Sequence, residues 1–105
     1  MKEIKAIIRP GRLPAVRDAL RKLPGFPGMS ISRVEGFSAP TRLGPRHDIH
    51  EELTDYTAKV RLEIVAPDEI VAAIVECITA CASTGHIGDG LIWVTPVEQA
   101  RFVQQ

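Results

Sequence analysis

The chain has 105 residues, and its 13 basic and 13 acidic side chains give a formal net charge of zero. A balanced chain has no overall field that would attract nucleic acid or an anionic membrane surface, so we expect neither as a partner. The length suits one domain, residues 1–105, with a single core. No segment approaches the roughly 20 apolar residues of a membrane span, and the first residues lack the apolar stretch of a signal peptide, which predicts a cytoplasmic protein.

The first half of the chain predicts a strand, a helix and a second strand. Over residues 2–9, Ile4, Ala6 and Ile8 alternate with Lys5, Ile7 and Arg9, and a Pro-Gly pair ends the strand. Apolar residues then recur at helical spacing over 13–23. The second strand is expected at about 29–37, although its apolar residues do not keep the parity of one strand face.

The second half repeats this order more clearly. Residues 58–65 alternate as a half-buried strand does, and Pro67 with two acidic residues opens a helix. A last strand is expected at 91–94. The apolar stripe of the helix consists of Ile70, Ala73, Ile74, Cys77, Ile78 and Cys81.

Two successive strand–helix–strand units predict an α+β fold, the ferredoxin-like βαββαβ sandwich, with an antiparallel sheet and both helices on one face. The other face of such a sheet is uncovered. Ile7, Val65 and Trp93 lie on the expected strands and predict an apolar patch that a neighbouring copy would cover. This fold hosts many unrelated activities, so the function has to be argued from motifs.

The two cysteines, Cys77 and Cys81, are four residues apart on one expected helix. This spacing could ligate a soft metal, but both residues fall on the stripe that should face the sheet. Free cysteine is among the most buried residue types, so we expect the pair to pack in the core.

The run from Thr84 to Val94 places a glycine-rich turn between an apolar helix and an apolar strand. Glycines 85, 88 and 90 allow a close backbone approach, and the amide groups of such a turn can hold phosphate. Asp89 can lock the turn by accepting hydrogen bonds from its own main chain. The alternative is a tight connection that binds no ligand.

Residues 38–56 join the two halves and show no apolar periodicity. The segment is longer than a hairpin connection requires, and we expect it to be mobile unless a ligand or partner orders it. Its charged run contains His47 and His50 beside acidic residues, a set that could bind zinc, copper or nickel. The alternative is an ordinary solvated run of charges.

The chain lacks the motifs of the enzymes and of other binding proteins that share the expected fold. The chain contains no asparagine, which acylphosphatases need, and no Cys-x-x-Cys loop of the small copper chaperones follows the first strand. The central strands offer no aromatic residues on which RNA bases could stack. Because no nucleophilic triad or carboxylate pair is present either, we expect a binding and signalling module and not an enzyme.

Six stretches of the chain match one known family in the same order: residues 1–10, 13–20, 28–29, 34–37, 59–65 and 84–90. Through them the chain resembles the PII nitrogen-signalling proteins over nearly its whole length. The resemblance implies a homotrimer of ferredoxin-like subunits, with an adenine nucleotide in the cleft between neighbours and a long T-loop that docks on transporters or enzymes. Segment 38–56 is similar to that loop.

Carried over position by position, the resemblance retains part of the family's nucleotide site. The residues that would shape the adenine and ribose pocket and the phosphate turn are Ile8, Ser30, Gly36, Phe37, Val65, Thr84, Gly88, Asp89 and Gly90. Lys59, which can pair with a carboxylate ligand in the family, is also retained.

Several polar or charged ligand contacts of the family are missing. Ala39 and Pro40 stand where the family has an arginine and a glutamine, and Leu91 replaces a lysine. Phe102 and Gln104 replace two arginines. A triphosphate would meet little compensating charge, so these departures from the family predict AMP, ADP or a cyclic nucleotide as effector, or no nucleotide, and not magnesium-ATP with 2-oxoglutarate.

The resemblance also implies that the long loop is the output element, mobile alone and ordered by a membrane transporter or an enzyme. The residues expected to dock there are Arg42, Arg46, His47, His50 and Glu52. The alternative function is that of a metal-responsive protein similar to the CutA family, with His47, His50 and His86 as ligands.

Overall fold

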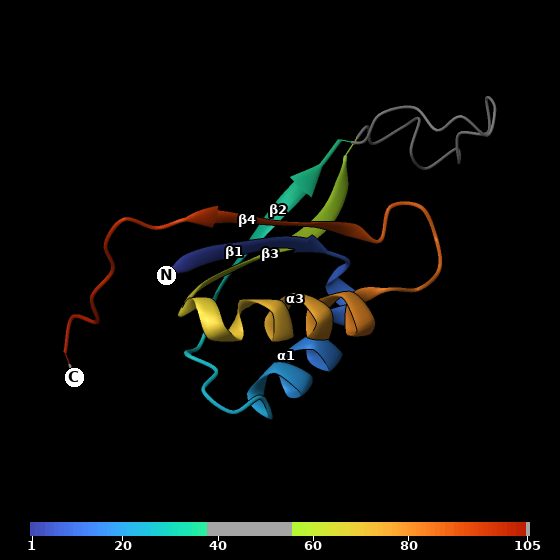
Figure 1. The fold of residues 1–105 in the computed structure, drawn as a ribbon. Coiled ribbons are helices and arrows are strands. Elements are labelled where there is room, and N and C mark those ends of the chain that lie inside the picture. Colours follow the sequence, from blue (N-terminus) through green and yellow to red (C-terminus); the bar gives the residue numbers. More distant parts are fainter. Residues whose placement is uncertain (38–55, 105) are drawn as a thin grey trace.

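The computed structural model describes residues 1–37 and 56–104 (Figure 1). Within these residues, four strands form one antiparallel sheet in the order β2-β3-β1-β4, and two α-helices lie together on one face of that sheet. This arrangement confirms the expected ferredoxin-like fold. The elements are β1 (Lys2–Ile8), a 3-10 turn (Pro10–Arg12), α1 (Leu13–Arg21), β2 (Ser30–Gly36), β3 (Thr57–Ala66), α3 (Asp68–Ala82) and β4 (Gly90–Pro96).

The core lies between the two central strands and the helices. On β1 the even-numbered residues from Ile4 to Ile8 are fully buried, as the alternation predicts. Each fully buried isoleucine or leucine contributes about 1.5–3 kcal/mol of transfer free energy. The remaining members of this core are Val16, Leu20, Val60, Leu62, Ile64, Ala66, Ile74, Ile78 and Ala82.

The element bounds differ from the expected ones mainly at two places. Helix α1 ends at Arg21, because the chain turns at Lys22 and Leu23 and then passes through the Pro-Gly pair at 24–25, which cannot continue a helix. Strand β4 runs from Gly90 to Pro96 and is longer than expected, since it pairs with β1 from Ile8↔Gly90 to Lys2↔Pro96.

The expected apolar stripe of α3 is partly wrong. The helix rests on the sheet along the row Ile74, Ile78 and Ala82, whose members are four residues apart. Ala73 is exposed. Cys77 and Cys81 are half-buried beside this row, so they border the core and do not form its centre.

The sheet face away from the helices carries both apolar and charged side chains. The register places Ile7, Val65 and Trp93 on this face, as expected, because their neighbours along each strand point into the core. Charged residues on the same face lie among these apolar ones and form ion pairs. Lys5 Nζ lies 3.6 Å from Glu3 Oε1, and Arg61 Nε lies 3.3 Å from Glu63 Oε1.

The register and edge position of β2 explain why its apolar residues do not keep one parity. Val34 pairs with Lys59 and Ile31 pairs with Leu62, so the two apolar residues lie on opposite faces of the sheet. The edge position of β2 tolerates this mixture, because Ile31 is 46% exposed. None of the described helices is long and apolar enough to cross a membrane.

Candidate functional site

The turn between α3 and β4 is held by one carboxylate. Asp89 accepts hydrogen bonds from the amide of Thr84 at 2.6 Å, from the amide of His86 at 3.3 Å and from the Thr84 hydroxyl. These contacts, Thr84 first, hold the pKa of Asp89 well below its usual range, and the nearby Arg9 guanidinium acts in the same direction. The prediction that Asp89 locks this turn is confirmed, and two of its amide groups are therefore already engaged.

Two cations from the central strands bind the same turn. Arg9 Nε donates to Asp89 at 3.0 Å, and Arg9 Nη2 donates to the carbonyl of Ile87 at 3.2 Å. Lys59 Nζ donates to the carbonyl of Gly88 at 2.7 Å. Lys59 is 9% exposed, and burial, followed by the neighbouring Arg9, lowers its pKa, whereas Asp89 raises it.

The sequence interpretation missed Arg9. The only signal for it was its position directly after β1, whose last residue, Ile8, pairs with Gly90. Arg9 and Asp89 are 80 residues apart in the sequence, and only the pairing of β1 with β4 brings them into contact.

Two glycines of the turn have different roles. Gly88 has a φ of 93°, and a Cβ there would lie 3.4 Å from Arg9 Nη2, the end of a flexible side chain. Gly90 has a φ of 140°, and a Cβ there would collide with the carbonyl oxygen of Ile7. Gly90 is therefore required by the packing of β4 on β1, whatever it binds.

The predicted nucleotide-site residues fall into two groups. The first group surrounds the turn, and we call this region the turn end. Gly36 belongs to the turn end because it lies against Lys59: a Cβ on Gly36 would be 3.4 Å from Lys59 Cγ. Phe37 follows Gly36 in the chain, and its ring centroid lies 5.8 Å from that of Tyr56. The side chain of Ile8 is only 1% exposed, so it packs in the core and cannot touch a ligand in this subunit.

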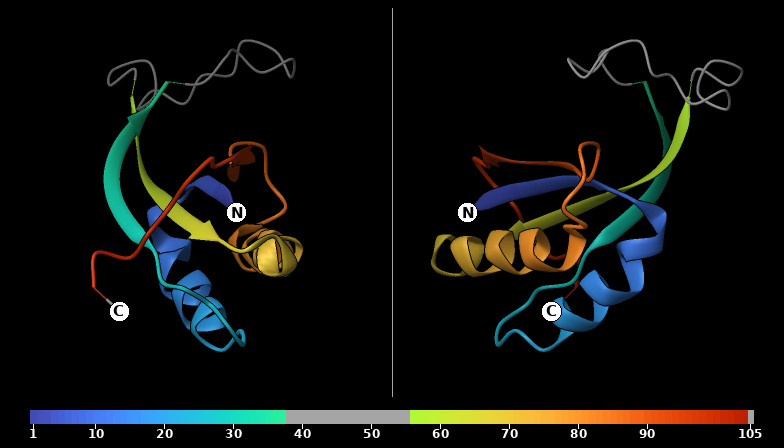
Figure 2. Two further views of the ribbon diagram at one scale, coloured as in Figure 1. Left: turned by 60° about the vertical axis from the view of Figure 1, so that its left-hand side comes forward. Right: turned by 90° about the vertical axis from the view of Figure 1, so that its right-hand side faces the viewer.

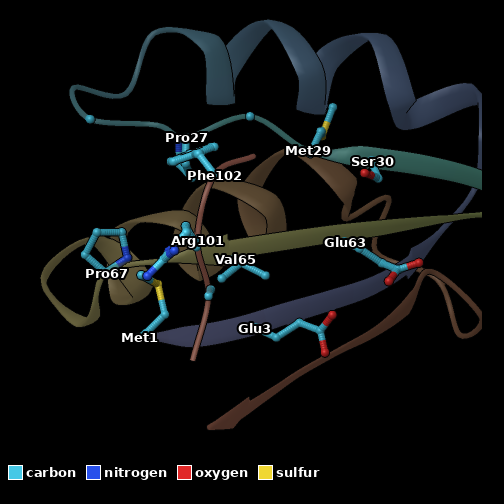
Figure 3. A pocket seen from close by; sticks show the side chains of 13 residues that line it. Met1, Glu3, Pro27, Met29, Ser30, Glu63, Val65, Pro67, Arg101 and Phe102 are labelled. Atoms are coloured by element: carbon cyan, nitrogen blue, oxygen red, sulfur yellow. The ribbon is translucent and has the colours of Figure 1, made fainter. Parts of the chain in front are cut away.

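The second group lies at the opposite end of the sheet, which we call the pocket end. Ser30 and Val65 line an open pocket of about 900 Å³ there. Figure 3 shows that the C-terminal segment with Arg101 and Phe102 crosses beside Val65, while the side chains of Glu3 and Glu63 stand on the neighbouring strands. The other lining residues are Met1, Gly25, Pro27, Gly28, Met29, Pro67 and Ala100.

The two groups do not meet within one subunit. Val65 pairs with Glu3 near the start of β1, whereas Gly90 pairs with Ile8 at its end. Five residues of extended strand separate these positions by about 17 Å. Figure 2 shows the C-terminal segment and the α3–β4 turn leaving opposite ends of β4.

The residues expected to dock a partner, 42, 46, 47, 50 and 52, lie outside the described residues, as do Ala39 and Pro40. Of the three histidines expected to bind metal, only His86 is described. It is exposed, with its ring Nδ1 3.2 Å from the Thr84 hydroxyl. Within residues 1–37 and 56–104, no group of three or more His, Cys, Asp or Glu side chains could hold a metal ion.

Comparison with known proteins agrees with this fold. The model of the family described as nitrogen regulatory protein P-II matches residues 1–105. The P-II protein of Haemophilus influenzae is 42% identical over 100 residues, which cover 95% of this chain and 88% of the relative. P-II protein 1 of Escherichia coli is 42% identical over 104 residues, which cover 99% of this chain and 90% of the relative. The P-II protein of Azospirillum brasilense is 38% identical over 99 residues, which cover 94% of this chain and 88% of the relative.

These matches extend over almost the whole chain and include the turn that Asp89 holds. They give no support to the metal-responsive alternative. With the βαββαβ topology and the matched sequence in agreement, the chain belongs to the PII family of nitrogen regulatory proteins, which are regulators in signal transduction and not enzymes.

Proposed function

We propose that the protein is a cytoplasmic signalling subunit that forms homotrimers and senses an adenine nucleotide in the clefts between copies. The bound state is passed to a transporter or an enzyme through segment 38–56. The observation that carries this proposal is the turn over residues 84–89, which the chain's own contacts already hold in one shape.

A turn fixed before binding favours affinity, because less conformational entropy is lost when the ligand arrives. Asp89 organises the turn from inside, while Arg9 and Lys59 hold two of its carbonyl groups from β1 and β3. Gly88 adopts a φ of 93°, which favours glycine, and it adds no side-chain atoms to the turn's surface. This combination supports a ligand-binding role over a plain connection.

The separation of the two groups supports a site between copies. Ser30 and Val65 lie at the pocket end, and Thr84 and Asp89 lie at the turn end. Along the strands, Val65 is about 17 Å from the level of Gly90, and Ser30, which is level with Lys5 of β1, is about 10 Å from it. In a ring of copies, the pocket end of one subunit would face the turn end of the next, which brings both groups to one ligand.

The charges at both ends favour an effector with few phosphates. The pocket end offers Arg101 as a cation, but also the carboxylates of Glu3 and Glu63. At the turn end, Arg9 and Lys59 already donate to the protein. A triphosphate would therefore have to displace existing contacts, whereas AMP or ADP would place less charge in the cleft.

Calorimetry of the full chain with AMP, ADP, cyclic AMP and ATP tests this proposal, with magnesium and 2-oxoglutarate added in a separate series. We expect AMP or ADP to bind more tightly than ATP, and light scattering to give a trimer. A monomer at micromolar concentration would refute the shared site. Tight magnesium-ATP binding enhanced by 2-oxoglutarate would refute the charge argument.

A matched pair of glycine variants tests the turn itself. Gly88→Ala should weaken nucleotide binding by about tenfold or more, because alanine disfavours a φ of 93°. Gly11→Ala is the control, since a Cβ at Gly11 meets no atom of the described residues within 4 Å. Equal affinities for the two variants would mean that the turn is only a connection.

A further inference from the structure

The two thiols of α3 form a pair that the proposed function does not use. Cys77 and Cys81 are free and half-buried. They lie beside the row of Ile74, Ile78 and Ala82 that packs on the sheet. Residues four apart on a helix are surface neighbours, so both thiols share one side of α3.

That side of α3 faces α1. Arg12, at the start of α1, donates from Nε to the carbonyl of Cys81 at 2.8 Å. Beyond the other end of α1, a Cβ on Gly25 would lie 3.6 Å from Ile70 Cδ1, and Ile70 falls on the same stripe as the two cysteines. The helices lie side by side in both views of Figure 2. The thiol pair therefore borders the seam between α1 and α3 and remains partly open to solvent.

The helix geometry opposes a disulfide at this pair. Side chains at this spacing have Cβ atoms about 5–6 Å apart, whereas a disulfide needs about 3.5–4.5 Å. Closing the bond would require α3 to unwind near its C-terminal end. Two metal–thiolate bonds of about 2.3 Å in line place the sulfurs about 4.6 Å apart, which side-chain rotation can reach without moving the backbone.

We propose that Cys77 and Cys81 bind one monovalent soft cation of the Cu(I) type in two-coordinate geometry, with each thiol releasing its proton to solvent. The ion keeps its oxidation state. Thiolates prefer such soft ions, and zinc in structural sites takes four ligands. In the described part of the chain, no third His, Cys, Asp or Glu side chain completes a cluster with the pair.

Anaerobic titration of the reduced full chain with Cu(I), in competition with a Cu(I) chelator, tests this inference. We expect one ion per chain and an ultraviolet thiolate-to-metal absorption. Cys77→Ser and Cys81→Ser should each weaken binding by at least about tenfold, because each removes one arm of the chelate. The control variant Ala80→Ser, at an exposed position of α3, should bind as the unmodified chain does.

A second measurement needs no variant and so does not depend on how the serine variants fold. In the unmodified chain, Cu(I) should protect both thiols from alkylation, and mild oxidation should give no intrachain disulfide by mass spectrometry. Alkylation that is unaffected by Cu(I), or Cu(I) binding that survives the loss of both cysteines, would overturn the proposal. Ready formation of the intrachain disulfide would overturn its geometric basis.

Discussion

The turn end and the pocket end of the sheet differ in how completely the subunit itself organises them. At the turn end, Asp89, Arg9 and Lys59 satisfy one another and the backbone around them. At the pocket end, Arg101 and Phe102 come from the C-terminal segment, which crosses an open surface, and Phe102 is 60% exposed. One end is finished within a single subunit, and the other presents surface that a neighbouring molecule can complete.

The largest effect is expected from Gly90→Val at the turn end. The new side chain would collide with the carbonyl of Ile7 and separate β4 from β1, which should cost about 3 kcal/mol or more of unfolding free energy. Urea unfolding measures this loss, with Gly11→Ala as the control. A loss below about 1 kcal/mol would show that the turn end is less rigid than its contacts indicate.

A pH-dependent effect is expected from Asp89→Asn. The pKa of Asp89 is lowered in the folded state, so the folded protein binds this proton less readily than the unfolded chain does. Its stabilising contribution is thus complete above the ordinary carboxyl pKa of about 4 and is lost as the pH falls below it. Denaturant unfolding between pH 7 and pH 2.5 should show the unmodified chain more stable at neutral pH and the difference shrinking in acid. A difference that stays constant with pH would contradict the Asp89 contacts.

At the pocket end, Arg101→Ala should affect binding more than stability. Arg101 is exposed and lines the pocket, so its loss should weaken nucleotide binding by roughly threefold to tenfold with little change in unfolding. Gln99→Ala, on the same segment but not among the pocket's lining residues, is the matched control for calorimetry. If both variants bind equally, the pocket end takes no part in the site.

The smallest effect is expected from Asp68→Asn. The carboxylate of Asp68 lies 2.5 Å from the N-terminal ammonium of Met1, which holds its pKa below the usual range, but the pair is exposed. The thermal midpoint should fall by no more than about 3 °C. Asp18→Asn is the control, because Asp18 also forms an exposed ion pair, with Arg17 at 3.1 Å. A much larger fall for Asp68→Asn would mean that the pocket end depends on the N-terminus.

Local patterns predicted the elements and part of the site. The alternation in β1 and β3 identified their buried faces, because a strand's period of two depends only on the order of residues. The glycines and Asp89 identified the turn, because a positive φ and a carboxylate that binds nearby amides also depend only on residues close in the sequence.

The resemblance of the whole chain identified the family, which local patterns could not do. Short motifs such as the glycine turn occur in many folds, so only agreement along the chain was specific enough. The same position-by-position transfer did not distinguish residues that share a face from residues that lie at opposite ends of the sheet.

What the sequence determined by itself was the order of strands and helices, their buried faces and the locked turn, all of which follow from neighbouring residues. The tertiary structure decided which distant residues meet. Arg9 and Lys59 reach the turn only because β1 pairs with both β3 and β4, and Val65 is separated from that turn by most of the length of β1. The packing of α3 also decided how far the cysteines are buried. Only the row of Ile74, Ile78 and Ala82 rests fully on the sheet, and Cys77 and Cys81, which lie beside that row toward α1, are half-buried.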